Sequence, residues 1–314
     1  MRVVFMGTPD FAVPSLKRLE ADGHTVSLVV TQADKPKGRG RVLTPPPVKE
    51  YALTRDWPVF QPTRMKAEKT LETIRAARPD VIVVVAFGRI LPPAILALPP
   101  YGCINVHGSL LPRYRGAAPI QWAVLNGDRE AGVTTMQMNE GLDTGDMLLK
   151  RTRPLPENMT AGELFELLCE DGADLLSETL RGLEQGTLHA EPQDDAQSSY
   201  APMLDKSMSR IDWRKSAWEI HNQVRGLNPW PSASTLYKGK LLKLHATRLG
   251  DFTNEQPGTV VELSPLQIAC GDGRLLVVDE VQFEGAKRMA ATDFLRGHPL
   301  QKGERLPGRE EEAF

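Results

Sequence analysis

The sequence predicts an α/β protein with a doubly wound, mostly parallel sheet, followed by a small C-terminal β-barrel. In the first half, apolar runs rich in β-branched residues and without polar alternation are interleaved with amphipathic helical segments. This pattern is typical of a parallel sheet that is covered on both faces. In the last third, short strand-like runs are separated by glycine-rich turns at regular spacing, which favours a barrel.

The elements of the first domain follow from these runs in chain order. An apolar run at 2–7 ends in glycine and precedes an amphipathic segment at 11–23, which predicts a strand, a turn and a helix. Further strands are expected at 25–32, 58–62, 81–87, 103–107 and 132–138, and a long helix from about Thr160 to Gly186. This succession predicts a Rossmann-like domain.

The second domain is expected after a polar stretch, EPQDDAQSSYAP at 191–202, whose composition is that of a linker. A helix is predicted around 216–227, followed by strands within 234–250, 258–263 and 266–283, which suits an OB-like barrel. We therefore expect a catalytic domain over 1–190, a linker over 191–206 and a barrel over 207–314.

Composition excludes several classes of protein. With 314 residues, 41% hydrophobic and 25% charged, the chain is an ordinary globular protein. Cys103, Cys169 and Cys270 lack metal-ligand spacing, so we expect buried thiols, a reducing compartment and no metal. Gly7 alone matches the dinucleotide fingerprint G-x-G-x-x-G, so NAD is not expected.

The chain also lacks the signals of export or membrane insertion. Its first residues reach a glycine and a turn too soon for a signal peptide, and no run of about 18 apolar residues occurs. We expect a cytoplasmic protein that makes no membrane contact. A net charge of −2 argues against a globally basic nucleic-acid binder, but the charges are unevenly placed.

Basic residues gather between 206 and 248, where nine Lys and Arg stand against two acids. One interpretation is a solvated positive face with Trp213, Trp218 and Trp230 in the core. The other is a surface that binds the phosphates of a nucleic acid. Its candidates are Lys206, Arg210 and Lys240, which would contribute affinity but little recognition of base sequence.

An amide, an imidazole and a carboxylate are the candidate catalytic groups. Asn105 and His107 are two residues apart at the end of the strand 103–107, so both side chains leave the same side of it. Ligands of open α/β sheets bind at the carboxyl ends of strands. A lone histidine there is more often structural, but Asp143, in the loop after the adjacent predicted strand, can join the pair at one edge of the sheet.

This trio suits the transfer of an acyl group to an amine. The transition state carries negative charge on the carbonyl oxygen and positive charge on the attacking nitrogen. Asn105 can donate a hydrogen bond to the oxygen, and His107, held protonated by Asp143, can donate to the same oxygen or protonate the leaving nitrogen. Asp143, or a water that it orders, can accept the proton of the amine. No serine or cysteine nucleophile is implied, so transfer would be direct.

Two further stretches have a structural and a functional interpretation. SLLP at 109–112 and the apolar loop from 86 are either packed loops or the walls of a pocket for a flat heterocycle. The candidates are Phe87, Gly88, Ile90, Leu91, Ser109, Leu110, Leu111 and Pro112. The basic stretch 34–51, with Lys35, Lys37, Arg39 and Arg41, is either a solvated loop or a mobile arm that grips phosphates.

These motifs together resemble those of the methionyl-tRNA formyltransferases of bacteria and organelles, nearly from end to end. The resemblance covers INVHGSLLPRYRGAAPIQWAVLNGD, GTPDFAVPSL, KGRGR, MNEGLDTGDML and NPWPSA. The Asn-x-His-x-Ser-Leu-Leu-Pro stretch and the Asp-Thr-Gly loop resemble all transferases that use 10-formyltetrahydrofolate. The GRG loop, RYRGAAPIQWA and the barrel behind a basic linker resemble the tRNA enzymes in particular.

The resemblance implies a role for each matching position. Asn105, His107 and Asp143 would be catalytic, and the residues from Ser109 to Pro112, with the 86–91 loop, would hold the folate. Arg39 and its loop would contact the acceptor stem of methionyl initiator tRNA, and the barrel would contact the inner side of the tRNA. A substrate of that size needs no second subunit, so we expect a monomer.

Two alternatives remain open at this point. A formyltransferase acting on an amino-sugar nucleotide would share the catalytic trio, but it would have little use for the basic arm or the basic entry to the barrel. A non-catalytic tRNA-binding protein on the same scaffold would have no use for the trio.

Overall fold

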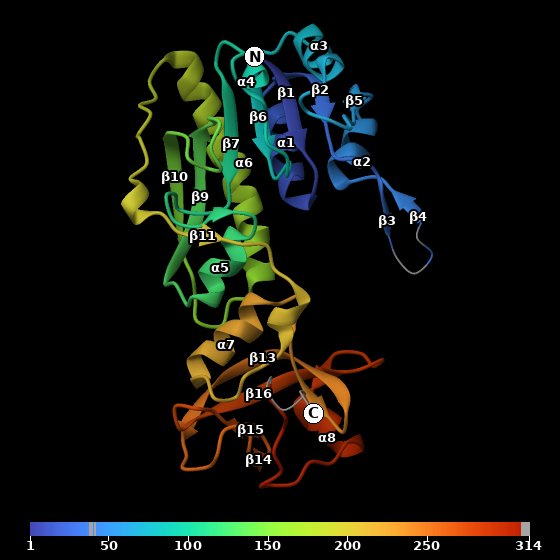
Figure 1. Ribbon diagram of the computed structural model, residues 1–314, viewed down its shortest axis with the longest axis vertical. Helices are drawn as coiled ribbons and strands as arrows, with labels where there is room; N and C mark the ends of the chain where they lie inside the picture. Colours follow the sequence, from blue (N-terminus) through green and yellow to red (C-terminus); the bar gives the residue numbers. More distant parts are fainter. Residues whose placement is uncertain (38–39, 41, 309–314) are drawn as a thin grey trace. The chain divides into compact units, whose positions relative to one another are not determined.

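The computed structural model describes residues 1–37, 40 and 42–308, and the chain forms two compact units (Figure 1). The first unit consists of Met1–Pro119, Ala131–Arg153 and Phe165–Pro202. The second consists of Ile120–Glu130, Pro154–Leu164 and the chain from Met203 onward. Two short segments that precede residue 165 therefore belong to the second unit.

A seven-stranded sheet forms the centre of the first unit, in the order β10-β9-β7-β6-β1-β2-β5 (Figure 1). Five of its strands are parallel: β1 (Arg2–Gly7), β2 (Thr25–Val30), β5 (Val59–Phe60), β6 (Val81–Val85) and β7 (Cys103–His107). The run at 81–85 is buried at every position, as a strand covered on both faces requires. The predicted doubly wound, mostly parallel sheet is confirmed.

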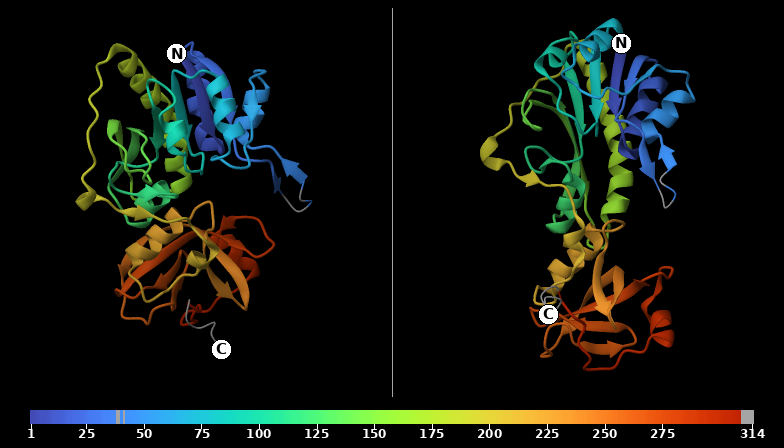
Figure 2. Two further views of the ribbon diagram at one scale, coloured as in Figure 1. Left: turned by 45° about the horizontal axis from the view of Figure 1, so that its top comes forward. Right: turned by 45° about the vertical axis from the view of Figure 1, so that its right-hand side comes forward.

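Helices cover both faces of this sheet. On one face, α3 (Glu68–Ala76) and α4 (Pro93–Leu96) bury Ile74 and Ile95 against alternate residues of the strands, including Cys103. On the other, α6 (Ala161–Gln185) packs closely enough that a Cβ on Gly172 would lie 2.9 Å from Val106 (Figure 2). An ion pair between Arg18 and Asp174 ties α1 (Val13–Ala21) to α6, and α2 (Pro47–Leu53) packs beside α1.

The strand beside β7 runs in the opposite direction. β9 (Glu130–Gln137) pairs antiparallel with β7, so that Ile104 lies opposite Gln137 and His107 opposite Thr134. β10 (Met147–Pro154), which the sequence patterns did not predict, is the edge strand. Because β9 ends beside the start of β7, the loop that follows must run back along the sheet to bring Asp143 toward His107.

The polar stretch after α6 lies along the first unit and is not a free tether. The chain passes outside β10, where Glu191 and Met147 exchange two backbone hydrogen bonds of 2.8 Å (Figures 1 and 2). After a 3-10 turn at Asp195–Gln197, β11 (Tyr200–Ala201) pairs in parallel with β8 (Arg115–Gly116). We call residues 191–201 the strap.

The second unit is built on a six-stranded sheet, whose core strands pair antiparallel. The order is β12 (Ala233–Tyr237), β13 (Lys240–Phe252), β16 (Arg274–Phe283), β15 (Leu266–Ala269) and β14 (Val260–Leu263), with β17 (Met289–Ala290) also paired to β16. Leu244, Leu276 and Phe294, the last from α8 (Ala291–Gly297), are in its buried core. The predicted small C-terminal β domain is confirmed as an antiparallel strand domain.

Helix α7 (Ala217–Gly226) begins at a capping box and holds the segment 154–164 within the second unit. Ser216 Oγ accepts from the backbone N–H of Glu219, whose carboxylate accepts from the N–H of Ser216. From the same helix, His221 Nε2 donates to the carbonyl of Glu157 at 2.9 Å, and Arg225 donates to the carbonyls of Pro156 and Met159. The helix therefore supplies side-chain donors to backbone carbonyls of this segment. The short helix α5 (Pro119–Leu125) also lies largely in this unit.

Two buried histidines make the stability of the second unit depend on pH. Burial lowers the pKa of His221 and of His245, so their protonated forms are disfavoured in the folded state. The unfolded chain then binds more protons, and the stabilising contribution is fully present above about pH 6.5 and is lost as the pH falls below that value toward the lowered pKa of the folded protein. We expect the free energy of unfolding to fall between pH 7.5 and 6.0.

The His245→Gln variant should show a smaller fall over this interval, whereas His189→Gln, at an exposed position, should behave as the wild type. Urea unfolding followed by tryptophan fluorescence measures this, because four of the five tryptophans, Trp122, Trp213, Trp218 and Trp230, lie in the second unit. Equal pH dependence in the wild type and His245→Gln would contradict the assignment.

Candidate active site

Asn105 and His107 lie at the carboxyl end of β7, on the side of the sheet that α3 and α4 cover. The strand alternates, so both side chains share the face of Cys103, which packs in that core. Among the described residues, the side-chain Oδ1 of Asn105 is buried and accepts no hydrogen bond. A buried amide oxygen without a hydrogen-bond donor is rare in a folded protein and points to a ligand that donates to it.

One hydrogen bond fixes the ring of His107. The side chain is only 6% exposed, and its Nε2 lies 2.8 Å from the carbonyl oxygen of Tyr114. A carbonyl can only accept, so Nε2 carries the hydrogen, and in the neutral ring Nδ1 is left as the acceptor nitrogen. Tyr114 holds a left-handed backbone conformation, with φ of 60°, and its N–H donates to Ser199 Oγ at 2.9 Å.

Asp143 brings a carboxylate to the free nitrogen of that ring. Its Oδ2 lies 3.8 Å from His107 Nδ1 and accepts a hydrogen bond of 2.8 Å from the backbone N–H of Gly116. The loop reaches this position by a tight path: Asp143 has φ of 53°, and a Cβ on Gly145 would lie 1.7 Å from the carbonyl of Gln137. Only glycine fits at position 145.

The geometry changes one part of the sequence-based mechanism. Because Nε2 is occupied by the carbonyl of Tyr114, the nitrogen of His107 that can exchange a proton with a substrate is Nδ1, the one that Asp143 faces. A proton on Nδ1 is attracted to the carboxylate, and a neutral Nδ1 can accept one. The site therefore combines an amide whose buried oxygen lacks a donor with a ring nitrogen that can exchange a proton.

Covalent catalysis by a thiolate finds no support in this structure. Cys103 lies two residues from Asn105 in the same strand, but burial raises the pKa of its thiol to about 12, as it does for Cys169 and Cys270. These groups stay protonated near neutral pH, and the thiol is a weak nucleophile. As expected from the sequence, all three cysteines are buried.

The eight predicted pocket residues divide into core and surface. Phe87, Leu91, Ser109 and Leu111 are buried, and Ser109 Oγ donates to the carbonyl of Arg113. These four side chains hold the two loops in place. Gly88 and Ile90 are exposed, Ile90 by 75%, and Leu110 and Pro112 are half-buried. Contact with a heterocycle would come from these four residues and from the backbone.

Gln32, which the sequence analysis did not single out, joins the loop after β6 to the base of the basic stretch. Its Nε2 donates to the carbonyl of Phe87 at 2.9 Å, and its Oε1 accepts from Lys35 at 3.1 Å. The approach is close, since a Cβ on Gly88 would lie 2.6 Å from Gln32 Nε2. The neighbouring Asp34 is held by Lys49 at 2.8 Å, which lowers the pKa of its carboxyl.

The predicted phosphate contacts lie on separate elements. Lys35 and Lys37 are in β3 (Lys35–Lys37), which forms a hairpin with β4 (Val42–Thr44), while Arg39 and Arg41 lie outside the described residues. In the second unit, Lys206 begins a 3-10 turn at Lys206–Ser209, and Lys240 begins β13; both are exposed. Arg210 is half-buried, and burial lowers the pKa of its guanidinium.

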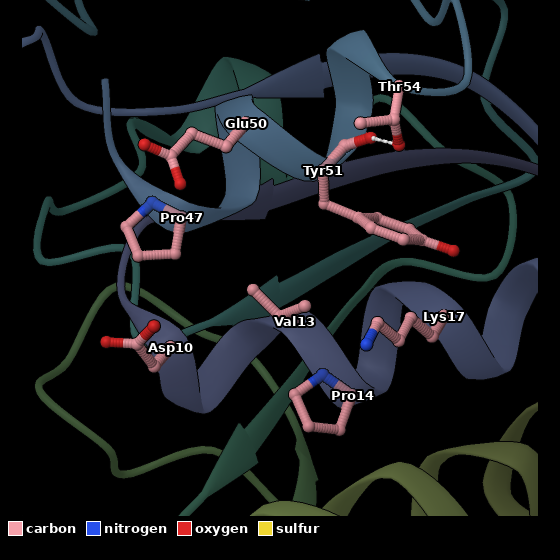
Figure 3. Close-up of a pocket in the computed structure, with 8 residues that line it drawn as sticks. All are labelled: Asp10, Val13, Pro14, Lys17, Pro47, Glu50, Tyr51 and Thr54. Atoms are coloured by element: carbon pink, nitrogen blue, oxygen red, sulfur yellow. Dashed lines mark hydrogen bonds between the residues drawn. The ribbon is translucent and has the colours of Figure 1, made fainter. Parts of the chain in front are cut away.

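A pocket of about 450 Å³ lies between α1 and α2, away from the residues predicted to be functional (Figure 3). Its walls are formed by Asp10, Val13, Pro14, Lys17, Pro47, Glu50, Tyr51 and Thr54. None of the three candidate catalytic residues lines it. Over the described part of the chain, no three His, Cys, Asp or Glu side chains gather as a metal site would need, and no helix is long and apolar enough to span a bilayer.

Several residues that shape the site were not assigned a role in it from the sequence. Tyr114 supplies a carbonyl, Gly116 an N–H and Ser199 a hydroxyl. The bonds of Gly116 and Ser199 span 27 and 85 residues of sequence, and that of Tyr114 spans seven. The left-handed conformations of Tyr114 and Asp143 also follow from the folded structure, since residues with side chains seldom adopt them.

Comparison with known proteins gives consistent matches over the whole length. The Formyl transferase family model matches residues 1–180, and the Formyl transferase, C-terminal domain model matches 203–299. The chain is 50% identical over 310 residues to the methionyl-tRNA formyltransferase of Acetivibrio thermocellus, covering 98% of this chain and 99% of the relative. It is 53% identical over 308 residues to that of Pelobacter propionicus, covering 98% and 96%.

Solved structures share the fold at greater distance. A crystal structure of the N-formyltransferase from Helicobacter canadensis, in complex with folinic acid and dTDP-3-aminofucose, aligns with a TM-score of 0.66 and 20% identity. The alignment covers 88% of this chain and 98% of that chain, and at this identity it shows the fold alone. The family model and the close relatives carry the assignment: this chain belongs to the formyl transferase family.

Proposed function

We propose that this chain transfers the formyl group of 10-formyltetrahydrofolate to the α-amino group of methionyl initiator tRNA. The observation that carries the proposal is the identity of about 50% to methionyl-tRNA formyltransferases over nearly the full length of both chains. The product, N-formylmethionyl-tRNA, serves translation initiation, so we place the reaction in the cytoplasm. One chain supplies all the proposed groups, so a monomer is sufficient.

Asn105, His107 and Asp143 are the proposed catalytic residues. The amine nitrogen attacks the formyl carbon, and the carbonyl oxygen gains negative charge, to which the side-chain amide of Asn105 donates. Hydrogen-bond donors aimed at a developing oxyanion stabilise such a transition state strongly.

His107 and Asp143 are proposed to move the proton. The amine must lose a proton and N10 of the folate must gain one when the C–N10 bond breaks. Nδ1 of His107 can accept the first proton and deliver the second, while the carboxylate of Asp143, 3.8 Å away, stabilises the charged ring. No covalent enzyme intermediate is needed, which agrees with the high pKa of about 12 of the Cys103 thiol.

The two substrates are assigned to different surfaces. We propose that the loops 86–91 and 109–112, through Gly88, Ile90 and their backbone, bind the folate. We propose that the stretch 34–44, with Lys206 and Lys240 of the second unit, contacts the phosphates of the tRNA. The amino-sugar alternative is not favoured, since the structural neighbour with that specificity is only 20% identical.

The direct test is formyl transfer from 10-formyltetrahydrofolate to purified methionyl initiator tRNA, with free methionine as the control acceptor. We expect transfer to the charged tRNA alone, with kcat/KM falling steeply as salt rises, because phosphate contacts release counterions.

Lys240→Ala should reduce the slope of log affinity against log salt by about one. Lys302→Ala, whose charge is paired with Glu262 at 2.7 Å, should leave the slope unchanged. Transfer that is insensitive to salt would contradict the tRNA surface, and no transfer would contradict the function.

Removal of the proposed catalytic side chains should abolish the chemistry without unfolding the chain. Asn105→Ala or His107→Ala is expected to lower kcat by about 100- to 1000-fold, the usual cost of losing one oxyanion donor or a general acid–base group. The matched controls are Asn254→Ala and His189→Ala at exposed positions, which should keep full activity. Single-turnover kinetics with circular dichroism as the folding check measure both quantities. Wild-type rates in either catalytic variant would refute the assignment.

A further inference from the structure

We propose that Gln193, in the strap, is a positioning residue that holds Asp143 in its catalytic place. The inference rests on the proposed function and extends it to a part of the chain with no assigned role. The strap lies between the two matched family models, which end at residue 180 and begin at residue 203, and its composition is that of a linker. In the folded chain the strap contacts the site through Gln193, which bonds to the Asp143 loop, and through Ser199, which bonds to Tyr114.

The amide of Gln193 closes the loop that carries Asp143. Its Nε2 donates to the carbonyl of Asp143 at 2.8 Å and to that of Gly145 at 2.7 Å. One amide group therefore uses both of its N–H bonds to hold two carbonyls of a single tight turn. The turn must stay tight, because Asp143 is left-handed and Gly145 lies against the carbonyl of Gln137.

The other end of Gln193 is fixed by Arg115. Its Oε1 accepts from Arg115 Nε at 3.0 Å and from Nη2 at 2.8 Å, and Arg115 Nη2 also donates to Asp195 at 2.7 Å. The side chain of Arg115 is 12% exposed, so this contact is largely withdrawn from water. The orientation of the Gln193 amide is thereby set, with its oxygen toward the guanidinium and its nitrogen toward the loop.

These contacts complete a ring around the catalytic pair. Arg115 stands between Tyr114, whose carbonyl accepts from His107, and Gly116, whose N–H donates to Asp143. From Arg115 the ring passes through Gln193 to the backbone of Asp143. Ser199 of the strap makes two further bonds. Its Oγ accepts from the backbone N–H of Tyr114, and its carbonyl accepts from the backbone N–H of Arg115. Gly116 holds the carboxylate of Asp143, and Gln193 holds the backbone of the same residue, so both support the separation of 3.8 Å between His107 and Asp143.

The test is the steady-state kinetics of the Gln193→Ala variant with methionyl-tRNA and 10-formyltetrahydrofolate. Displacement of a reacting group by about 1 Å can cost about 100-fold in rate, so we expect kcat to fall by about 10- to 100-fold. KM for both substrates should stay within about twofold, since Gln193 is assigned no substrate contact. Gln197→Ala is the matched control: Gln197 is an exposed strap residue whose side chain donates to Asp194, away from the Asp143 loop, and its loss should leave kcat unchanged.

Two further variants separate positioning from general support. Gln193→Glu keeps an acceptor for Arg115 but replaces the donors with an oxygen that faces two carbonyls, so it should be at least as impaired as Gln193→Ala. In an Asp143→Asn background, Gln193→Ala should change kcat less than about twofold, because residues that act as one unit are not additive.

The outcomes distinguish this inference from the proposed function. Wild-type kcat in Gln193→Ala or Gln193→Glu, or the same loss with and without Asp143→Asn, would overturn the positioning role while the transfer reaction stood. Absence of formyl transfer by the unaltered protein would overturn the proposed function itself. A raised KM at unchanged kcat would make Gln193 a substrate contact and would also overturn the inference.

Discussion

The hydrogen bond from His107 Nε2 to the carbonyl of Tyr114 is the interaction on which the rest of the site depends. It decides which nitrogen carries the hydrogen and turns Nδ1 toward Asp143. Tyr114 is left-handed, with φ of 60°, and two residues later the chain reaches Asp143 through Gly116. The N–H of Gly116 then holds the carboxylate, so one short segment, 114–116, orients both titratable groups.

The three candidate catalytic residues are held in two ways, either by a strand of the central sheet or by hydrogen bonds to a loop. β7 lies between the parallel strand β6 and the antiparallel strand β9, in a sheet that helices cover on both faces, so packing in the core fixes the positions of Asn105 and His107. Asp143 comes from a loop that doubles back beside an antiparallel strand, and it is positioned by hydrogen bonds to Gly116 and, through its backbone, to Gln193. The position of this loop therefore depends on the strap, which is distant in sequence but packs against the loop within the first unit.

The patterns that predicted the fold were those governed by burial. The strands 2–7, 81–85 and 103–107 and the long helix were predicted within a few residues, because a covered parallel sheet demands continuous apolar runs. The direction of β9 and the edge strand β10 were not predicted, since β10 alternates exposed and half-buried residues and its charged side chains resemble those of a loop. In the site, spacing placed Asn105 and His107 on one face, but it could not give the fixed tautomer of His107 or the partner Gln193. Both depend on carbonyl groups, which every residue has and no sequence pattern marks.

The tautomer of His107 is the most direct measurement of this account. In protein labelled with ¹⁵N-histidine, two-bond ¹⁵N–¹H couplings distinguish the two neutral forms, and the spectrum of His107→Gln assigns the resonance among the six histidines. At a pH where the ring is neutral, we predict hydrogen on Nε2 and a free Nδ1. Hydrogen on Nδ1 would mean that the carbonyl of Tyr114 does not hold the ring, and it would contradict the proposed route of the proton through the site.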